Sequence, residues 1–382
     1  MNTNSSTIFT LGLSESIDCS ATTDTNALYH MVGMNTGNLA FHHAINQLIG
    51  KSPRSIPWSS PAEIVDSTGQ VGILPCANQL GSHADMGAFA DTLSRVKCSL
   101  VAVGIGAQSS SSLDEFPELP AGTLRWIEQI TEHAKSNRPN ITVRGDFTLR
   151  VLEHYGFHGK ALALGCPSLL INKSPVLGAK LSERYRQPFR KVAIAAGHTD
   201  HISLGRLESS LVRIMESTQG SYITQATDEF IALSRGDLSY VSEDYKNHLR
   251  AYLGLSVEGE QLDDWIRQYF ICFFNIPAWI EYLRRFDLVI GTRIHGVMLA
   301  IQAGVPGLCI AYDSRIREIC EKSLIPYVMA NEVSDGFTLQ DVKSMINFNG
   351  AEFDKNRAKL HSAYRDFFTS NGVPVTPPNL RS

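Results

Sequence analysis

FDLVIGTRIHGVMLAIQAGVPGLCIAYDSR, residues 286–315, holds the clearest strand–helix–strand pattern in the chain. The apolar runs Phe286–Thr292 and Gly307–Tyr312 predict buried strands, and His295–Ala303 predicts a helix that ends at Gly304. Two buried strands joined by a helix are typical of a parallel sheet with helices on its faces. This part of the chain therefore predicts an α/β fold.

The same alternation continues on both sides of this stretch. Further strands are predicted at Leu100–Ile105, Ile141–Val143 and Ala161–Leu164, and from Lys191 onward. Polar residues predominate between Ala161–Leu164 and the strand that begins at Lys191, so we place a domain boundary there. The chain is divided into an N-terminal domain (1–180) and a C-terminal domain (181–382) with a terminal helix. Two consecutive α/β halves predict two Rossmann-like domains that face each other across a cleft.

Composition excludes several classes of protein. The 382 residues suffice for two cores, and 43% hydrophobic with 19% charged residues argue against disorder. A net charge of −4 gives no basic surface for nucleic acid. We expect no secretory signal, because residues 1–16 show no basic region followed by an apolar one. We expect no transmembrane segment, because no apolar run approaches about 18 residues. The seven cysteines are scattered, which is typical of reduced thiols and predicts a cytoplasmic protein.

Basic residues follow the predicted strands of residues 286–315. Arg293 and His295 come directly after the first strand, and Gly296 permits a close approach of backbone or ligand. Tyr312 and Arg315 follow the second strand. Ligands of open α/β sheets bind beyond the carboxyl ends of the strands, and a helix begins here with free N–H groups. Together these features favour an anion site over an ordinary surface turn.

The ordered set of motifs resembles the polysaccharide pyruvyl transferase family. The C-terminal motifs are Thr292-Arg293-Ile294-His295-Gly296, Ala303-Gly304-Val305-Pro306 and Tyr312-Asp313-Ser314-Arg315, the last with Arg where many members have Lys. The upstream motifs are Asn35-Thr36-Gly37-Asn38, Gly104-Ile105-Gly106-Ala107-Gln108, Val143-Arg144-Gly145 and Gly165-Cys166-Pro167-Ser168.

The resemblance implies a fold similar to GT-B glycosyltransferases and transfer of a pyruvyl group from phosphoenolpyruvate onto a saccharide. The product is a cyclic ketal, phosphate is released, and neither a cofactor nor a metal takes part. His295 and Arg144 are the implied catalytic residues. The implied donor-binding residues are Arg293, Arg315, Thr292, Gly296 and Tyr312, and the acceptor-side or loop residues are Asn35, Gly37, Asn38, Gly106, Gln108 and Ser168. The resemblance also allows the protein to associate peripherally with lipid-linked glycans that serve as acceptors.

The sequence leaves two alternative functions open. One is a GT-B-type glycosyltransferase that uses a nucleotide sugar, although no ribose-binding carboxylate stands out beside Gly304. The other is a saccharide-binding protein without catalytic activity. The motif His198-Thr199-Asp200-His201 contains possible metal ligands, but too few neighbours in sequence complete a zinc site, which favours a loop that contacts donor or acceptor.

Overall fold

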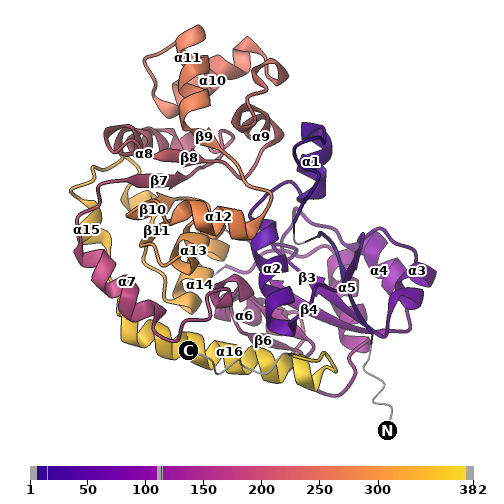
Figure 1. The fold of residues 1–382 in the computed structure, drawn as a ribbon. Helices are drawn as coiled ribbons and strands as arrows, with labels where there is room; N and C mark the ends of the chain where they lie inside the picture. Colours follow the sequence, from indigo (N-terminus) through magenta and orange to yellow (C-terminus); the bar gives the residue numbers. More distant parts are fainter. Residues whose placement is uncertain (1–6, 15, 110–112, 114, 376–382) are drawn as a thin grey trace.

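The computed structural model describes residues 7–14, 16–109, 113 and 115–375. In this part of the chain the strands form two parallel six-stranded sheets, flanked by helices (Figure 1). The first sheet has the order β2-β1-β3-β4-β5-β6. Its strands are β1 (Ile8–Leu11), β2 (Arg54–Ile56), β3 (Val71–Pro75), β4 (Ser99–Ile105), β5 (Ile141–Val143) and β6 (Ala161–Ala163).

The second sheet has the order β12-β11-β10-β7-β8-β9. Its strands are β7 (Val192–Ala195), β8 (Ser221–Ile223), β9 (Phe270–Ile271), β10 (Leu288–Gly291), β11 (Gly307–Ala311) and β12 (Tyr327–Met329). The predicted α/β class, with two Rossmann-like units in a GT-B-like arrangement, is therefore confirmed.

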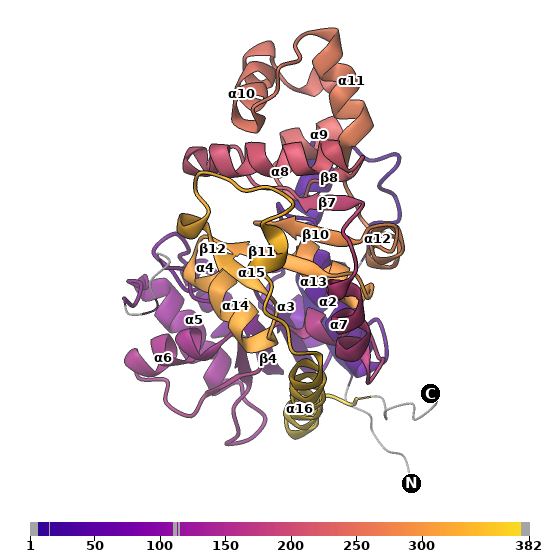
Figure 2. The same ribbon diagram turned by 90° about the vertical axis from the view of Figure 1, so that its left-hand side faces the viewer.

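Helices connect and cover the strands of each sheet. Those up to the second sheet are α1 (Thr25–Met31), α2 (Asn38–Ile49), α3 (Ala62–Thr68), α4 (Gly87–Leu93), α5 (Ala121–Glu132), α6 (Asp146–His154), the 3₁₀ turn η1 (Pro167–Leu170) and α7 (Leu177–Arg186). The later ones are η2 (Ile202–Leu204), α8 (Gly205–Ser217), α9 (Asp228–Ser234), η3 (Leu238–Tyr240), α10 (Glu243–Leu253), α11 (Glu260–Tyr269), α12 (Ile276–Leu283), α13 (Ile294–Gln302), α14 (Ser314–Ser323), η4 (Ala330–Glu332), α15 (Val342–Met345) and α16 (Gly350–Ser370). Figures 1 and 2 both show α10 and α11 beyond the second sheet, on the side away from the first unit.

Each sheet reverses its strand order at one point. In the first sheet the reversal lies between β1 and β3, and in the second between β7 and β10. Loops at a reversal diverge to opposite faces of the sheet, so a crevice opens there beyond the carboxyl ends of the strands. The loop that carries Arg293 follows β10 and so belongs to such a crevice.

A continuous apolar core joins the two units. Helix α2 of the first unit contacts α12, α13, α16 and η1. Its buried residues Leu39, Phe41 and Ile45 belong to the same hydrophobic cluster as the strands of the second sheet. The two units therefore share a packed interface in addition to the connection along the chain.

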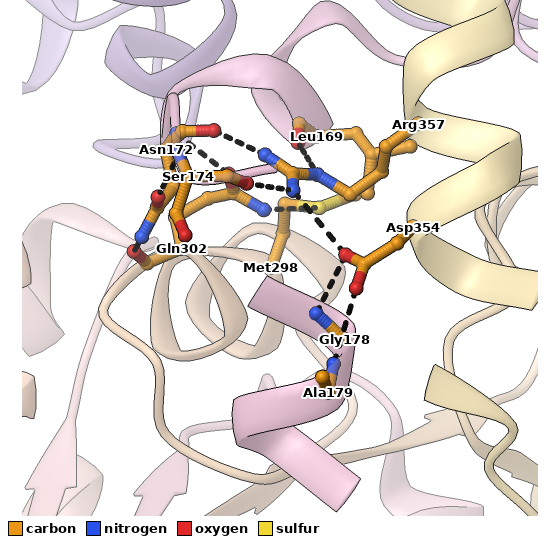
Figure 3. Close-up of polar contacts among 9 residues, drawn as sticks. All are labelled: Leu169, Asn172, Ser174, Gly178, Ala179, Met298, Gln302, Asp354 and Arg357. Atoms are coloured by element: carbon orange, nitrogen blue, oxygen red, sulfur yellow. Dashed lines mark hydrogen bonds and ion pairs between the residues drawn. The ribbon is translucent and has the colours of Figure 1, made fainter. Parts of the chain in front are cut away.

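The C-terminal helix fastens the segment between the sheets. Helix α16 runs along both units in Figure 1 and packs against α7. Its buried Arg357 donates hydrogen bonds to the carbonyl oxygens of Leu169, Asn172 and Ser174. Asp354 accepts from the backbone N–H groups of α7 at Gly178 and Ala179 (Figure 3).

The domain division at residue 180 stays a prediction, and this position falls within α7. Other expectations are refined by the structure. Residues 228–269, for which the sequence analysis gives no element, form α9, η3, α10 and α11, and the short strands β1, β2, β3, β9 and β12 add to those predicted. None of the described helices combines the length and the apolar character that crossing a bilayer requires.

Candidate functional site

A cleft of about 610 Å³ lies between the two units where their strand reversals face each other. Its residues from the first unit are Leu13, Tyr29, Gly33, Met34, Asn35, Asn38, Phe41, His42, Trp58, Pro75, Ala77, Asn78, Gln79, Gln108 and Arg144. Those from the second unit are His198, His201, Gln225, Ala226, Thr292, Arg293, Ile294, His295, Tyr312, Arg315 and Ile316. Most of them follow the carboxyl end of a strand, as the α/β topology requires.

Arg144 is a buried cation at the end of β5. Its side-chain Nε donates to the Gly104 carbonyl oxygen at 3.0 Å, and Nη2 donates to that of Cys76 at 3.4 Å. The guanidinium carbon lies 5.8 Å from the centre of the Phe41 ring. Burial lowers the pKa of Arg144 below its ordinary value. These bonds hold the guanidinium against the cleft wall, and the group remains the first unit's only charged side chain among the described lining residues.

Gly106 makes room for this arginine. A Cβ atom at position 106 would lie 2.8 Å from Cδ of Arg144 and 2.9 Å from the Ala77 carbonyl oxygen. Such a contact is closer than carbon atoms pack, so a side chain here would displace Arg144 or the backbone. Gly106, expected as an acceptor-side loop residue, therefore lies behind Arg144 and does not line the cleft.

His295 lies in the first turn of α13 and is 7% exposed. Its ring packs 5.6 Å from Phe41, and its Nε2 lies 3.6 Å from Sγ of Cys166. Burial lowers the pKa of His295 well below its ordinary value, and the positive charges of Arg144 and Arg315 lower it further. The imidazole of the free protein is therefore neutral at pH 7.

Arg293 and Arg315 carry hydrogen-bond donors that the protein does not use. Arg293 lies at the N-cap of α13, and no hydrogen bond or ion pair joins its side chain to another described residue. Arg315 pairs with Oδ2 of Asp313 at 3.2 Å, while its Nε is buried without a partner. Desolvation first and the charge of Arg293 second lower the pKa of His198 to about 4, and the same causes lower that of His201. The charge of Arg293 thus has no ion-pair partner among the described residues, while that of Arg315 is shared with Asp313.

Thr292 and Tyr312 complete the second unit's wall. Both line the cleft, and Thr292 is buried at the end of β10. The Tyr312 ring lies 4.8 Å from the ring of His201. His198 Nδ1 lies 3.5 Å from Asp200 Oδ2, but no three His, Cys, Asp or Glu side chains within the described ranges converge as a metal site.

Asn35 and Asn38 line the cleft and also shape its turn. The Asn35 side-chain oxygen accepts from the Gly37 N–H at 2.8 Å. The Asn38 amide donates to the carbonyl oxygens of Val32 and Gly33. The turn therefore uses part of the hydrogen-bonding capacity that the sequence analysis assigned to a ligand.

Ser168, Gly37 and Gly296 are placed behind the cleft surface. Ser168 is fully buried, and its Oγ lies 3.0 Å from the Cys166 sulfur that faces His295. A Cβ at Gly37 would lie 2.7 Å from Oε1 of Gln225, and one at Gly296 would lie 2.8 Å from its Nε2. Like Gly106, these residues do not line the cleft. Gln108 does, and its Oε1 accepts from the Asn78 amide.

The sequence analysis missed Gln225. This residue follows β8, is 1% exposed and borders the cleft between two loops from different units. Its Nε2 is buried and has no partner. Only its position after a strand end could have drawn attention to it. His42 and Trp58 also line the cleft, and burial lowers the pKa of His42 to about 3.

Comparisons with known proteins give one family and a distant set of structures. The family model described as polysaccharide pyruvyl transferase matches residues 78–314. No curated protein matches the chain at a significant level. Among solved structures, UDP-GlcNAc 2-epimerase from Methanocaldococcus jannaschii shares 10% identity over 94% of this chain and 99% of its own, with a TM-score of 0.44.

Two further solved structures are similarly distant. The S. aureus MnaA–UDP structure has 10% identity and a TM-score of 0.44, covering 97% of this chain and 92% of its own. The α,α-trehalose 6-phosphate synthase from Burkholderia multivorans has 12% identity and a TM-score of 0.39, covering 88% and 74%. Scores below 0.5 do not extend these likenesses to function.

Proposed function

The chain belongs to the polysaccharide pyruvyl transferase family, and we propose that it transfers the pyruvyl group of phosphoenolpyruvate to a saccharide. In this reaction two hydroxyl groups of the sugar become the oxygens of a cyclic ketal, and phosphate is released. Phosphoenolpyruvate is the donor substrate, and the acceptor is a saccharide.

The observation that carries this proposal is the convergence of Arg144, Arg293, Arg315 and His295 on one cleft. Phosphoenolpyruvate carries a phosphate and a carboxylate, and a guanidinium group pairs with either anion through parallel hydrogen bonds. The partnerless Nε of Arg315 and the unpaired guanidinium of Arg293 supply such donors. We assign these two residues to the donor, with Thr292 and Tyr312 beside them.

The proposed reaction has four steps that balance in atoms and charge. An acid protonates the methylene carbon of the donor, which becomes a methyl group and leaves the neighbouring carbon electrophilic. One sugar hydroxyl adds to that carbon, and its proton restores the acid. The bond between that carbon and the phosphate oxygen then breaks, and the second hydroxyl adds to the same carbon to close the ketal. Its proton leaves with the phosphate.

His295 and Arg144 are the two candidates for the acid. Imidazole is the stronger acid near neutral pH once it is protonated, but His295 is neutral in the free protein. Arg144 is charged and lies on the same cleft, yet a guanidinium is a very weak acid. We propose His295 as the acid in the donor complex, with Arg144 stabilising the charge that develops on the donor.

The guanidinium groups supply the positive charge that the leaving phosphate needs, so we propose that no cofactor takes part. We further propose that the protein acts in the cytoplasm, where phosphoenolpyruvate is present, on free or lipid-linked glycans. Calorimetric titration with phosphoenolpyruvate in excess chelator should show saturable binding. Binding that appears only after a divalent ion is added would contradict this part of the proposal.

The decisive experiment incubates the protein with phosphoenolpyruvate and a panel of saccharides, and follows phosphate release and acceptor mass together. We expect phosphate release that depends on the acceptor, with the mass gain of one pyruvyl ketal. Transfer of a sugar from a nucleotide sugar, without phosphate release from phosphoenolpyruvate, would instead establish a glycosyltransferase. Sugar binding without either reaction would establish a binding protein.

A further inference from the structure

The first unit contributes an aromatic platform to the cleft. Trp58 lies between β2 and α3, lines the cleft and is partly exposed. Its ring packs 4.9 Å from that of Phe89 and 6.1 Å from that of Trp126, counted between ring centres. These two buried side chains hold the indole in place, so it offers a fixed apolar face to whatever enters the cleft.

Amide side chains line the same wall. The Asn78 Nδ2 donates to Oε1 of Gln108 at 2.7 Å, and Oε1 of Gln79 accepts from the Ala77 N–H at 2.7 Å. These bonds orient the three amides and leave the Nε2 groups of Gln79 and Gln108 and Oδ1 of Asn78 with no partner in the described residues. The wall therefore presents both donors and an acceptor next to an aromatic ring.

This wall is also uncharged apart from Arg144. The other described lining residues of the first unit are apolar, aromatic or amide-bearing, and the one histidine, His42, is neutral because burial lowers its pKa to about 3. The cationic groups Arg293 and Arg315 stand on the opposite wall. The cleft thus separates a charged half from a neutral half.

We propose that Trp58, Gln79, Asn78 and Gln108 form the acceptor subsite and that it takes an uncharged pyranoside. This inference rests on the proposed function. One face of a pyranose ring carries mainly C–H groups and packs on an aromatic ring, while its hydroxyl groups exchange hydrogen bonds with amides.

The charges of the cleft exclude charged sugars from this subsite. The three guanidinium groups of the cleft are assigned to the phosphate and carboxylate of the donor, so the carboxylate of a uronic acid would enter this wall without a free cationic partner. The ammonium group of an amino sugar would lose its hydration there as well, because the described lining residues include no carboxylate to pair with it. Neutral sugars, N-acetylated ones included, meet neither penalty.

Tryptophan fluorescence tests this subsite without any turnover. The chain has four tryptophans, of which Trp126, Trp265 and Trp279 are at most 7% exposed. Trp58 is partly exposed in the cleft, so a sugar that stacks on it changes the emission. The probes are the methyl glycosides of glucose, galactose and mannose and their N-acetylamino forms, each compared with its uronic acid and its free-amine form, with and without phosphoenolpyruvate.

We expect at least one neutral glycoside to change the emission saturably, and its charged counterparts to bind on the order of 10-fold more weakly or worse. Trp58→Ala should abolish the response and raise the acceptor KM on the order of 10-fold, with phosphoenolpyruvate affinity unchanged by calorimetry. Trp58→Tyr should retain most of the acceptor affinity. Phe116→Ala removes a partly exposed aromatic ring outside the cleft and serves as the control.

Gln79→Ala provides a second variant should Trp58→Ala fail to fold, and it should also raise the acceptor KM alone. The proposal is overturned when no neutral glycoside changes the emission, when a charged sugar is the preferred acceptor, or when the folded Trp58 and Gln79 variants keep the normal acceptor KM. An enzyme that releases phosphate normally in those variants keeps its proposed function and loses this subsite. If a glycoside changes the emission but no acceptor causes phosphate release from phosphoenolpyruvate, the subsite is supported and the proposed function is contradicted.

Discussion

Replacing Arg357 tests whether α16 secures the segment between the two sheets. The guanidinium is 6% exposed and donates to the carbonyl oxygens of Leu169, Asn172 and Ser174 (Figure 3). Burial lowers its pKa to about 10, so the group stays charged at neutral pH. Arg357→Met keeps most of the side-chain volume and removes all three hydrogen bonds, together with the longer ion pair to Asp354 at 3.8 Å. The carbonyl oxygens are then left without these donors.

The expected loss follows from these bonds. A hydrogen bond whose partner is removed costs about 1–1.5 kcal/mol when the remaining group is partly buried, which gives roughly 3–4.5 kcal/mol for three. Removing a buried cation recovers about 1–2 kcal/mol of desolvation. We therefore expect the free energy of unfolding to fall by about 1–3.5 kcal/mol, or Tm by about 2–14 °C in a protein with domains of this size.

Urea denaturation measures the change in the unfolding free energy of the protein, and trypsin digestion measures local opening of the segment between the sheets. Lys355→Met, an exposed charge loss on the same helix, is the matched control and should change stability by less than about 0.5 kcal/mol. Lys173 is exposed within the fastened segment, so trypsin should cut there faster in Arg357→Met than in the control. Equal unfolding free energies and equal cleavage rates in the two variants would refute the role given to Arg357.

Three further substitutions test the cleft and its surroundings. Gly106→Ala should displace Arg144 and lower turnover on the order of 100-fold while the circular dichroism spectrum stays native; unchanged turnover would contradict the close contact. Arg293→Gln should raise the pKa of His198 from about 4 without restoring its ordinary value, because desolvation is the larger cause; titration by NMR measures this, and an unchanged pKa would argue against the contribution of Arg293. Burial raises the pKa of Glu318 from its ordinary value of 4.5 to about 7. The protonated carboxyl therefore contributes its full stability below pH 4.5, and this contribution is lost as the pH rises through 7. Glu318→Gln should therefore gain stability relative to the natural protein by up to about 3 kcal/mol at pH 8 but not at pH 4.5, and a difference that does not vary with pH would refute this.

The fold could be predicted where central, buried strands have an uninterrupted apolar sequence. The strands β7, β10 and β11 are buried along their whole length, so they appear as uninterrupted apolar runs. The strands β1 and β3 are equally buried but were missed, because Thr10 interrupts the first and Gly72 and Pro75 interrupt the second. The edge strands β2 and β12 are partly exposed and only 3 residues long, and they lack this signal. The same limit applies to β9, which has 2 residues.

The part of the candidate site that lies on neighbouring strands of the second sheet could be predicted from the sequence. Arg293 and His295 follow β10, and Arg315 follows β11, so their proximity follows from parallel topology. Trp58 meets them only because the two units pack against each other, and no local pattern encodes that packing. Gln225 follows β8 of the same sheet, but a single amide after a strand end matches no motif. Gly106 and Gly296 were predicted as site residues from their motifs, but they do not line the cleft. They leave space for the neighbouring side chains of Arg144 and Gln225.

The protonation of His295 links donor binding to the chemistry. In the free protein, burial and the charges of Arg144 and Arg315 keep the imidazole neutral. A negative charge about 4 Å away contributes about 4 kcal/mol at the effective dielectric of such a site, which corresponds to about three pKa units. Donor phosphate bound to the arginines would therefore offset their effect and let His295 take up a proton.

An acid that forms only in the donor complex imposes an order on the reaction. Phosphoenolpyruvate should bind with uptake of a proton, which calorimetry detects as a binding enthalpy that varies with the ionisation enthalpy of the buffer. His295→Asn should remove the uptake and lower turnover by roughly 100-fold or more while the donor still binds. If proton uptake and turnover both persist in that variant, the acid is not His295, and Arg144 is the remaining cation that the donor can reach from the opposite wall.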